Sequence, residues 1–155
     1  MELIYDGSGT DDTPLTSNTN VRGTEATNTD NATLGQVITY IKKIEGTLVG
    51  SVYCKLFNTA DALIVVETSS KVLTDSDLTT SYLEFTFPFT NSNVISNGYR
   101  VGIYYNDSGT IWYQKTVATS GTPYGKYDAV HWLSNGTDWG GQSADHSYNM
   151  DIYTG

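Results

Sequence analysis

Cysteine, histidine and positive charge are scarce in this chain of 155 residues. The single cysteine excludes an intrachain disulfide, and the two histidines and one cysteine lack the spacing of a zinc site. Lysine and arginine number 8 against 17 acidic residues, which gives a net charge of −9. Because this charge repels a phosphate backbone, nucleic acid is not expected as a partner, and an anionic membrane surface is disfavoured.

The chain also lacks the patterns that mark a membrane segment or a catalytic centre. It shows neither a signal-peptide pattern nor an apolar run of about 18 residues, so membrane insertion is not expected. His131 and His146 lie outside any nucleophile-elbow motif, and no glycine-rich loop precedes a helix. The carboxylates have no sequence context that marks a catalytic pair. We therefore expect a protein that is not an enzyme.

Tyrosine, threonine, serine, asparagine and glycine are abundant, whereas charged residues make up only 16% of the chain. This composition favours strands and turns over helices. The strongest core signal is the strict alternation of apolar residues over 83–89, and Pro88 within it predicts a strand end or an edge strand. About eight to ten short strands separated by turns predict an all-β fold, an antiparallel two-sheet β-sandwich with jelly-roll-like topology. The length fits a single domain over residues 1–155.

Residues 1–33 are expected to differ from the rest of the domain. A short strand at Met1–Tyr5 precedes a polar segment, 6–31, which predicts a long loop or a pair of irregular strands. We interpret residues 1–33 as a polar N-terminal arm. Further along, Cys54 alternates with apolar neighbours and is expected to be a small buried residue. Other predicted strands cover 34–44, 47–57, 63–68, 127–133 and 148–152, and 75–80 predicts a polar loop or one helical turn.

Residues 99–117 are the most informative stretch for function. Two alternating runs flank a glycine-containing turn, which predicts a β-hairpin. In the expected register Tyr104 faces Trp112, while Arg100 and Gln114 lie on the same face. Aromatic rings beside a guanidinium and an amide suit a polyhydroxylated ligand, because sugar C–H surfaces stack on rings and hydroxyls need polar partners. The alternative is that the rings only brace a twisted sheet.

Two further tryptophans are candidates for the same ligand. Trp132 lies in a predicted strand, and Trp139 follows the Asn135-Gly136 turn and precedes two glycines. A tryptophan beside glycines leaves room for a ligand, although Trp139 could equally cover one end of the sandwich. The candidate ligand-binding residues are therefore Arg100, Tyr104, Trp112, Gln114, Trp132 and Trp139.

Acidic residues near the N-terminus point to a structural calcium ion. Hard oxygen ligands suit Ca²⁺, and the terminal strand could run beside the first one. The alternative is a solvated acidic loop, since the complete EF-hand pattern is absent. The candidate metal ligands are Asp6, Asp11, Asp12, Glu25, Asp30 and Asp151.

Several segments occur in a familiar order from about Leu34 onward. They are Tyr40–Thr47, Val52–Phe57, Leu78–Tyr82 with Phe85–Phe87, Gly98–Ile103, and Ser134–Trp139 before the closing strand. This pattern resembles the jelly-roll β-sandwich modules of extracellular microbial and viral proteins, which are similar to carbohydrate-binding modules. The resemblance implies a location outside the cell or on a cell or virion surface. It also implies glycan binding, a structural calcium ion, or service as a spacer or assembly unit.

The favoured interpretation is a non-catalytic carbohydrate-binding module that stacks glycan or polysaccharide rings on surface aromatics. The alternative is a structural subunit of a surface filament or virus particle. Such a subunit would self-associate through exposed strand edges and use its polar arm to pair with neighbours.

Overall fold

The computed structural model describes residues 1, 3–6, 11–16, 21–26, 32–105, 110–117, 123–124, 127–134, 138–143, 146–148 and 150–155. These residues form strands joined by turns, with a single 3₁₀ turn, η1, at Asp75–Asp77. No helix among them is long and apolar enough to cross a membrane.

The strands form two sheets, and every pair of neighbouring strands is antiparallel. The first sheet has the order β1-β15-β4-β10-β14, with β2 on β10 and with β7 and β8 on β4. Its strands are β1 (Leu3–Asp6), β2 (Asp11–Thr16), β4 (Ala32–Lys43), β7 (Leu83–Pro88), β8 (Val94–Ile95), β10 (Thr110–Val117), β14 (His146–Tyr148) and β15 (Met150–Thr154).

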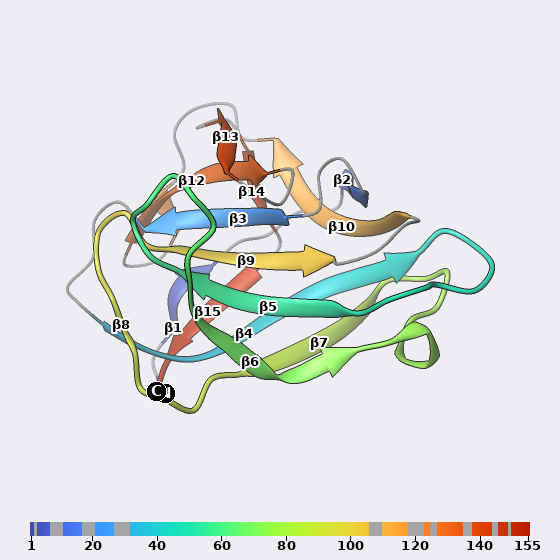
Figure 1. The fold of residues 1–155 in the computed structure, drawn as a ribbon, viewed down its shortest axis with the longest axis horizontal. Helices are drawn as coiled ribbons and strands as arrows, with labels where there is room; N and C mark the ends of the chain where they lie inside the picture. The colour runs from blue at the N-terminus through green and yellow to red at the C-terminus, as the bar shows by residue number, and fades with distance from the viewer. Residues whose placement is uncertain are drawn as a thin grey trace.

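The second sheet has the order β11-β12-β3-β9-β5-β6, with β13 also paired to β12. Figure 1 shows β12, β3, β9, β5 and β6 of this sheet one below the other. Its strands are β3 (Val21–Ala26), β5 (Val52–Phe57), β6 (Val65–Leu73), β9 (Arg100–Tyr105), β11 (Pro123–Tyr124), β12 (Tyr127–Ser134) and β13 (Trp139–Ser143).

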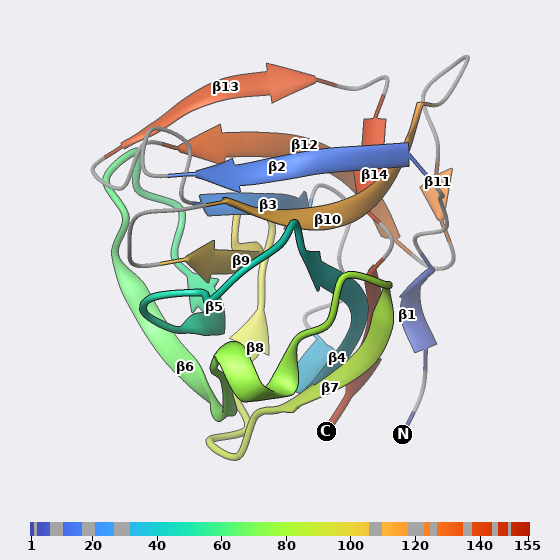
Figure 2. The same ribbon diagram turned by 90° about the vertical axis from the view of Figure 1, so that its right-hand side faces the viewer.

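The chain passes repeatedly from one sheet to the other, as in a jelly roll. β3, β4 and β5 alternate between the sheets, and so do β8, β9 and β10. The first and last strands pair, which places the two chain ends at the same end of the molecule (Figure 2). The predicted all-β antiparallel two-sheet β-sandwich is thus confirmed.

The main core lies between the two sheets and follows from period-2 alternation. On β5, Val52, Cys54 and Leu56 are fully buried, whereas Tyr53 and Lys55 are partly exposed. Cys54 is buried as expected, and this burial raises the pKa of its thiol. The core is completed by buried apolar side chains from β2, β4, β6, β7, β8, β9, β10 and β15 and from the connections between strands.

The predicted hairpin over 99–117 is wrong. β9 pairs with β3 and β5 in the second sheet, whereas β10 pairs with β2, β4 and β14 in the first. Tyr104 therefore lies opposite Tyr53 and Val21, not opposite Trp112. The alternating pattern identified both strands correctly, but it carries no information about which strand each one pairs with.

The polar segment 6–31 contains two strands, β2 in the first sheet and β3 in the second. Two strands were one of the two predicted forms of this segment. β3 lies between β12 and β9 inside the second sheet, and Leu15 and Val21 are fully buried. The interpretation of residues 1–33 as an arm does not fit this position. Each of these two strands contains a single large apolar residue, Leu15 or Val21, so hydropathy alone did not reveal that they belong to the sheets.

The alternation over 83–89 produced strand β7, with Phe87 fully buried and Phe89 nearly so. Leu83 is 39% exposed, so the apolar pattern extends beyond the core at its first residue. β7 ends at Pro88 and pairs only with β4 among the described strands, as expected of an edge strand with a proline. The segment 75–80, predicted as a polar loop or one helical turn, contains the 3₁₀ turn η1.

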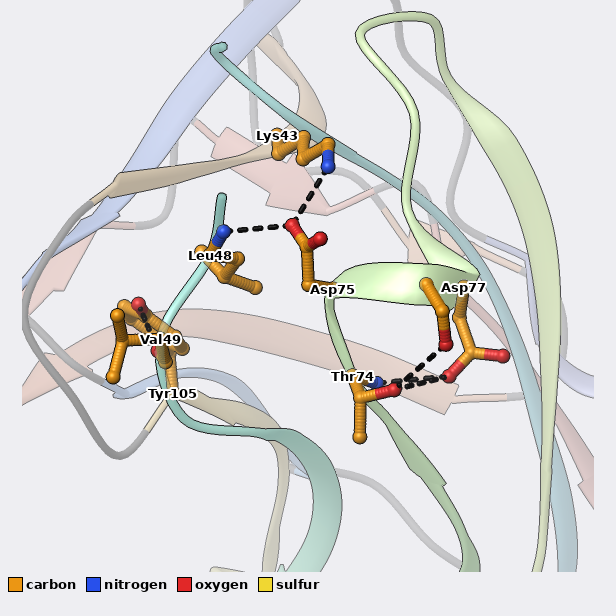
Figure 3. A network of polar contacts seen from close by, with 8 residues as sticks. Lys43, Leu48, Val49, Thr74, Asp75, Asp77 and Tyr105 are labelled. Atoms are coloured by element: carbon orange, nitrogen blue, oxygen red, sulfur yellow. Dashed lines mark hydrogen bonds and ion pairs between the residues drawn. The ribbon is translucent and has the colours of Figure 1, made fainter. Parts of the chain in front are cut away.

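A polar network holds the connection between β4 and β5 (Figure 3). Asp75 Oδ1 accepts hydrogen bonds from Lys43 Nζ at 2.6 Å and from the Leu48 backbone N–H at 2.7 Å. The Leu48 hydrogen bond, followed by Lys43, lowers the pKa of Asp75. Nearby, the buried Tyr105 hydroxyl donates to the Val49 carbonyl at 2.7 Å. These contacts fix residues 44–51 against η1 and the end of β9.

Candidate functional site

The side of the second sheet that points away from the core carries an unusual set of side chains. We call it the outer face. Because neighbours along a strand alternate between faces, the register places its residues in three rows across β3, β9 and β5. The rows are Val21–Tyr104–Tyr53, Gly23–Gly102–Lys55 and Glu25–Arg100–Phe57.

One half of the outer face is covered by a second, smaller apolar cluster of Val21, Phe57 and Trp139. The Trp139 indole meets the Phe57 ring edge-on, with centroids 5.1 Å apart. Its backbone N–H donates to the Asp61 carbonyl at 2.7 Å, and Ala62 and Asp138 form an isolated β-bridge. Residues 58–64 and the start of β13 therefore lie across this half of the sheet.

Arg100, on the sheet, binds both Trp139 and the segment 58–64 that lies across it. Its Nε donates to Glu25 Oε2 at 3.1 Å, its Nη1 donates to the Ala60 carbonyl at 3.0 Å, and its Cζ lies 5.3 Å from the centroid of a Trp139 ring. The side chains of Arg100 and Trp139 are only 4% and 5% exposed. Both residues thus support the site from within, rather than presenting the free surface groups that the predicted hairpin implied.

The outer face also carries two partly exposed tyrosines, Tyr53 and Tyr104, which are neighbours in the first row. The rings of Tyr53 and Tyr104 lie 6.1 Å apart between centroids and are tilted by 43°. Lys55 Nζ lies 4.1 Å from the Tyr104 centroid and 5.2 Å from the Tyr53 centroid. Partial burial lowers the pKa of Lys55. We call these three residues the tyrosine platform.

Two paired glycines, Gly23 and Gly102, leave two of the three positions in the middle row of the outer face without a side chain. A Cβ atom on Gly23 would stand 2.9 Å from Cη2 of Trp139, and one on Gly102 would stand 2.9 Å from the Arg22 carbonyl oxygen. Contacts this short force a neighbour to move, so a side chain at Gly23 would displace the indole. Gly23 therefore lets Trp139 approach the sheet, and Gly102 lets β9 lie close to the backbone of β3.

The structure brings three of the predicted ligand residues onto one face and leaves two apart from them. Arg100, Tyr104 and Trp139 share the outer face. Trp132 lies in the same sheet, opposite Gly23, and its side chain is outside the described part of the structure. On β10 of the first sheet, Trp112 lies opposite Lys42 and Pro14, and Gln114 opposite Asp12; their side chains are likewise not described.

Sequence reasoning missed Tyr53 and Lys55. A signal for them was present, since both alternate with the apolar residues Val52, Cys54 and Leu56 and so had to point away from the core. Their position beside Tyr104 was not visible in the sequence, because β5 and β9 are separated by more than 40 residues and pair only in the folded sheet.

The candidate calcium ligands fall into separate places. Asp6 lies opposite Asp151 where β1 and β15 pair, as the prediction of adjacent terminal strands required. Asp11 and Asp12 lie on β2, Glu25 is engaged by Arg100 in the other sheet, and Asp30 is outside the described residues. Within the described ranges, no three acidic, histidine or cysteine residues form a group that could hold a metal ion. Calcium binding remains a prediction.

The chain matches no family model, no curated protein and no solved structure.

Proposed function

We propose that the tyrosine platform is the carbohydrate-binding site of a non-catalytic module that acts outside the cell or on a cell or virion surface. The observation that carries the proposal is the pair of partly exposed rings on the outer face of the second sheet, with their centroids 6.1 Å apart. Aromatic faces attract the C–H surface of a sugar ring, and the tyrosine hydroxyls can exchange hydrogen bonds with its hydroxyl groups.

The covered half of the outer face supports this role by holding the platform in position. Tyr104 packs against the cluster of Val21, Phe57 and Trp139, which restricts the movement of its ring. Arg100 ties β9 to β3 and to the Ala60 carbonyl in the crossing segment. A ring that is already ordered loses less conformational entropy when a ligand stacks on it.

The affinity for a short saccharide should be modest. The two rings stay partly in contact with water, and few polar groups at the platform are desolvated. Repeated engagement along a polysaccharide, or by several copies of the domain, would raise the effective affinity without new contacts.

The test is a glycan array followed by titration calorimetry with Tyr104→Ala and Tyr53→Ala. Each substitution should lower the affinity for the best-bound glycan by about twofold to tenfold, because a stacked ring contributes about 0.5–1.5 kcal/mol. Tyr82→Ala is the matched control, since Tyr82 also lies under a lysine, with Lys42 Nζ 4.6 Å from its centroid, but far from the platform on the chain between η1 and β7. Equal affinity in all four proteins would contradict the proposal.

A second candidate function, assembly into a filament or particle, is favoured by the edge strand β6. Among the described strands it pairs only with β5, and Val65, Val66 and Val72 along it are exposed. An exposed apolar edge is a template for pairing with another chain. Sizing chromatography over a range of concentrations tests this function, and a monomer at every concentration would contradict it.

A further inference from the structure

Among the described residues, the ammonium group of Lys55 makes only aromatic contacts, with the rings of Tyr104 and Tyr53. Its ammonium group carries three N–H donors, but the tyrosine rings offer π-faces and no hydrogen-bond acceptor at the contacts observed. Over the ranges that the structure describes, no carboxylate lies within ion-pair distance of Lys55 and no oxygen accepts a hydrogen bond from it. Its positive charge is therefore not neutralised by a described neighbour.

The other charges in the three rows do not alter this balance. Arg100 and Glu25 form an ion pair at 3.1 Å and cancel one another. Lys55 is thus left as the net positive charge of the three rows, in a chain whose total charge is −9. A cation that lies over partly exposed rings and has no described carboxylate within ion-pair distance is suited to an anionic group on a stacked ligand.

We infer that the platform selects sugars that carry a carboxylate, such as uronic acids, with Lys55 as the residue that determines this specificity. The inference rests on the proposed carbohydrate-binding function and names its ligand class. Lys55 Nζ lies over both rings, so a pyranose that stacks on this side of either ring takes the place of the ammonium group, which the lysine stem can then hold at the edge of the sugar, within reach of a carboxylate substituent. A carboxylate in that position accepts charge-assisted hydrogen bonds, whereas a hydroxymethyl group makes weaker neutral ones.

The test uses matched probes at pH 7: oligosaccharides of galacturonate and of glucuronate, each as the free acid and as its methyl ester. The ester keeps the ring and removes the charge. The wild type should bind at least one free acid about fivefold or more tightly than its ester, as expected for an ion pair of about 1 kcal/mol. Lys55→Met should abolish this preference, so that the free acid and its ester bind with equal affinity, and Lys55→Arg should keep the preference.

Lys42→Met is the matched control, because Lys42 makes a similar contact with a tyrosine in a different part of the molecule. It should leave the preference for the acid unchanged. Thermal melts establish that each variant is folded.

The outcomes separate the two proposals. If the wild type binds neutral glycans on the array but shows no preference for either free acid, the inference about Lys55 is overturned and the carbohydrate function stands. A preference that survives in Lys55→Met also overturns it. If no glycan of any kind binds, the carbohydrate function itself fails, and the inference fails with it.

Discussion

Trp139 is the residue whose replacement best tests the architecture of the outer face. It is 5% exposed, meets the Phe57 ring at 5.1 Å and lies directly over Gly23. Truncation to alanine removes the largest member of the second apolar cluster and leaves a cavity between residues 58–64 and the sheet. Burial of this kind predicts a loss of about 3–5 kcal/mol in the free energy of unfolding.

That loss is a large part of the stability of a single domain, which is about 5–15 kcal/mol. At about 2–4 °C per kcal/mol for a chain of this size, the melting midpoint should fall by about 6–20 °C. Urea unfolding followed by circular dichroism measures the free energy, and a thermal scan measures the midpoint. Val49→Ala is the control, because Val49 is 56% exposed and its truncation should change the stability by no more than about 0.5 kcal/mol.

Trp139→Phe separates packing from hydrogen bonding. The indole Nε1 is buried and has no hydrogen-bond partner among the described residues, so phenylalanine removes ring volume without breaking a described hydrogen bond. We expect it to lose less than half of what alanine loses. If Trp139→Ala lowers the stability by less than about 1 kcal/mol, the residue is not part of a core and the description of the outer face is refuted.

Gly23→Ala extends the same test. The new methyl group would meet Cη2 of Trp139 at 2.9 Å, which predicts a loss of about 1–3 kcal/mol. The loss should be smaller when Trp139 is already alanine, because part of the clash has been removed. A double-mutant cycle measures this coupling. The backbone carbonyl of Val101, 3.0 Å away, keeps the relief incomplete.

Two further predictions concern charge and calcium. Because hydrogen bonds from Leu48 and Lys43 lower the pKa of Asp75 in the folded state, its contribution to stability is present above the pKa of the unfolded chain and is lost as the pH falls through the folded value. Wild type should therefore exceed Asp75→Asn in stability at pH 6, and urea titrations should show the difference shrinking between about pH 5 and pH 2; a constant difference would contradict this. A calcium ion held near Asp6 and Asp151 should raise the melting midpoint in calcium over that in chelator, and Asp151→Asn should remove the increase; identical midpoints would eliminate the predicted site.

Local patterns in the sequence determined which segments are strands and which side chains enter the core. Alternation placed Phe87 and Cys54 inside, and Pro88 marked the end of an edge strand. These features follow from the two-residue period of a strand and from the missing N–H of proline, so each can be inferred from a few neighbouring residues.

Only the tertiary structure decided which strands are neighbours. The strand neighbours in turn determine which side chains meet at the candidate site. The glycine-containing turn after Tyr105 was typical of a hairpin, but its two strands belong to different sheets. Tyr104 instead meets Tyr53 and Lys55 from β5, while Arg100 and Trp139 are buried under residues 58–64. Strand pairing depends on contacts between residues far apart in the chain. The sequence of one strand therefore determines the faces of that strand, whereas the packing of the whole sandwich selects its partners.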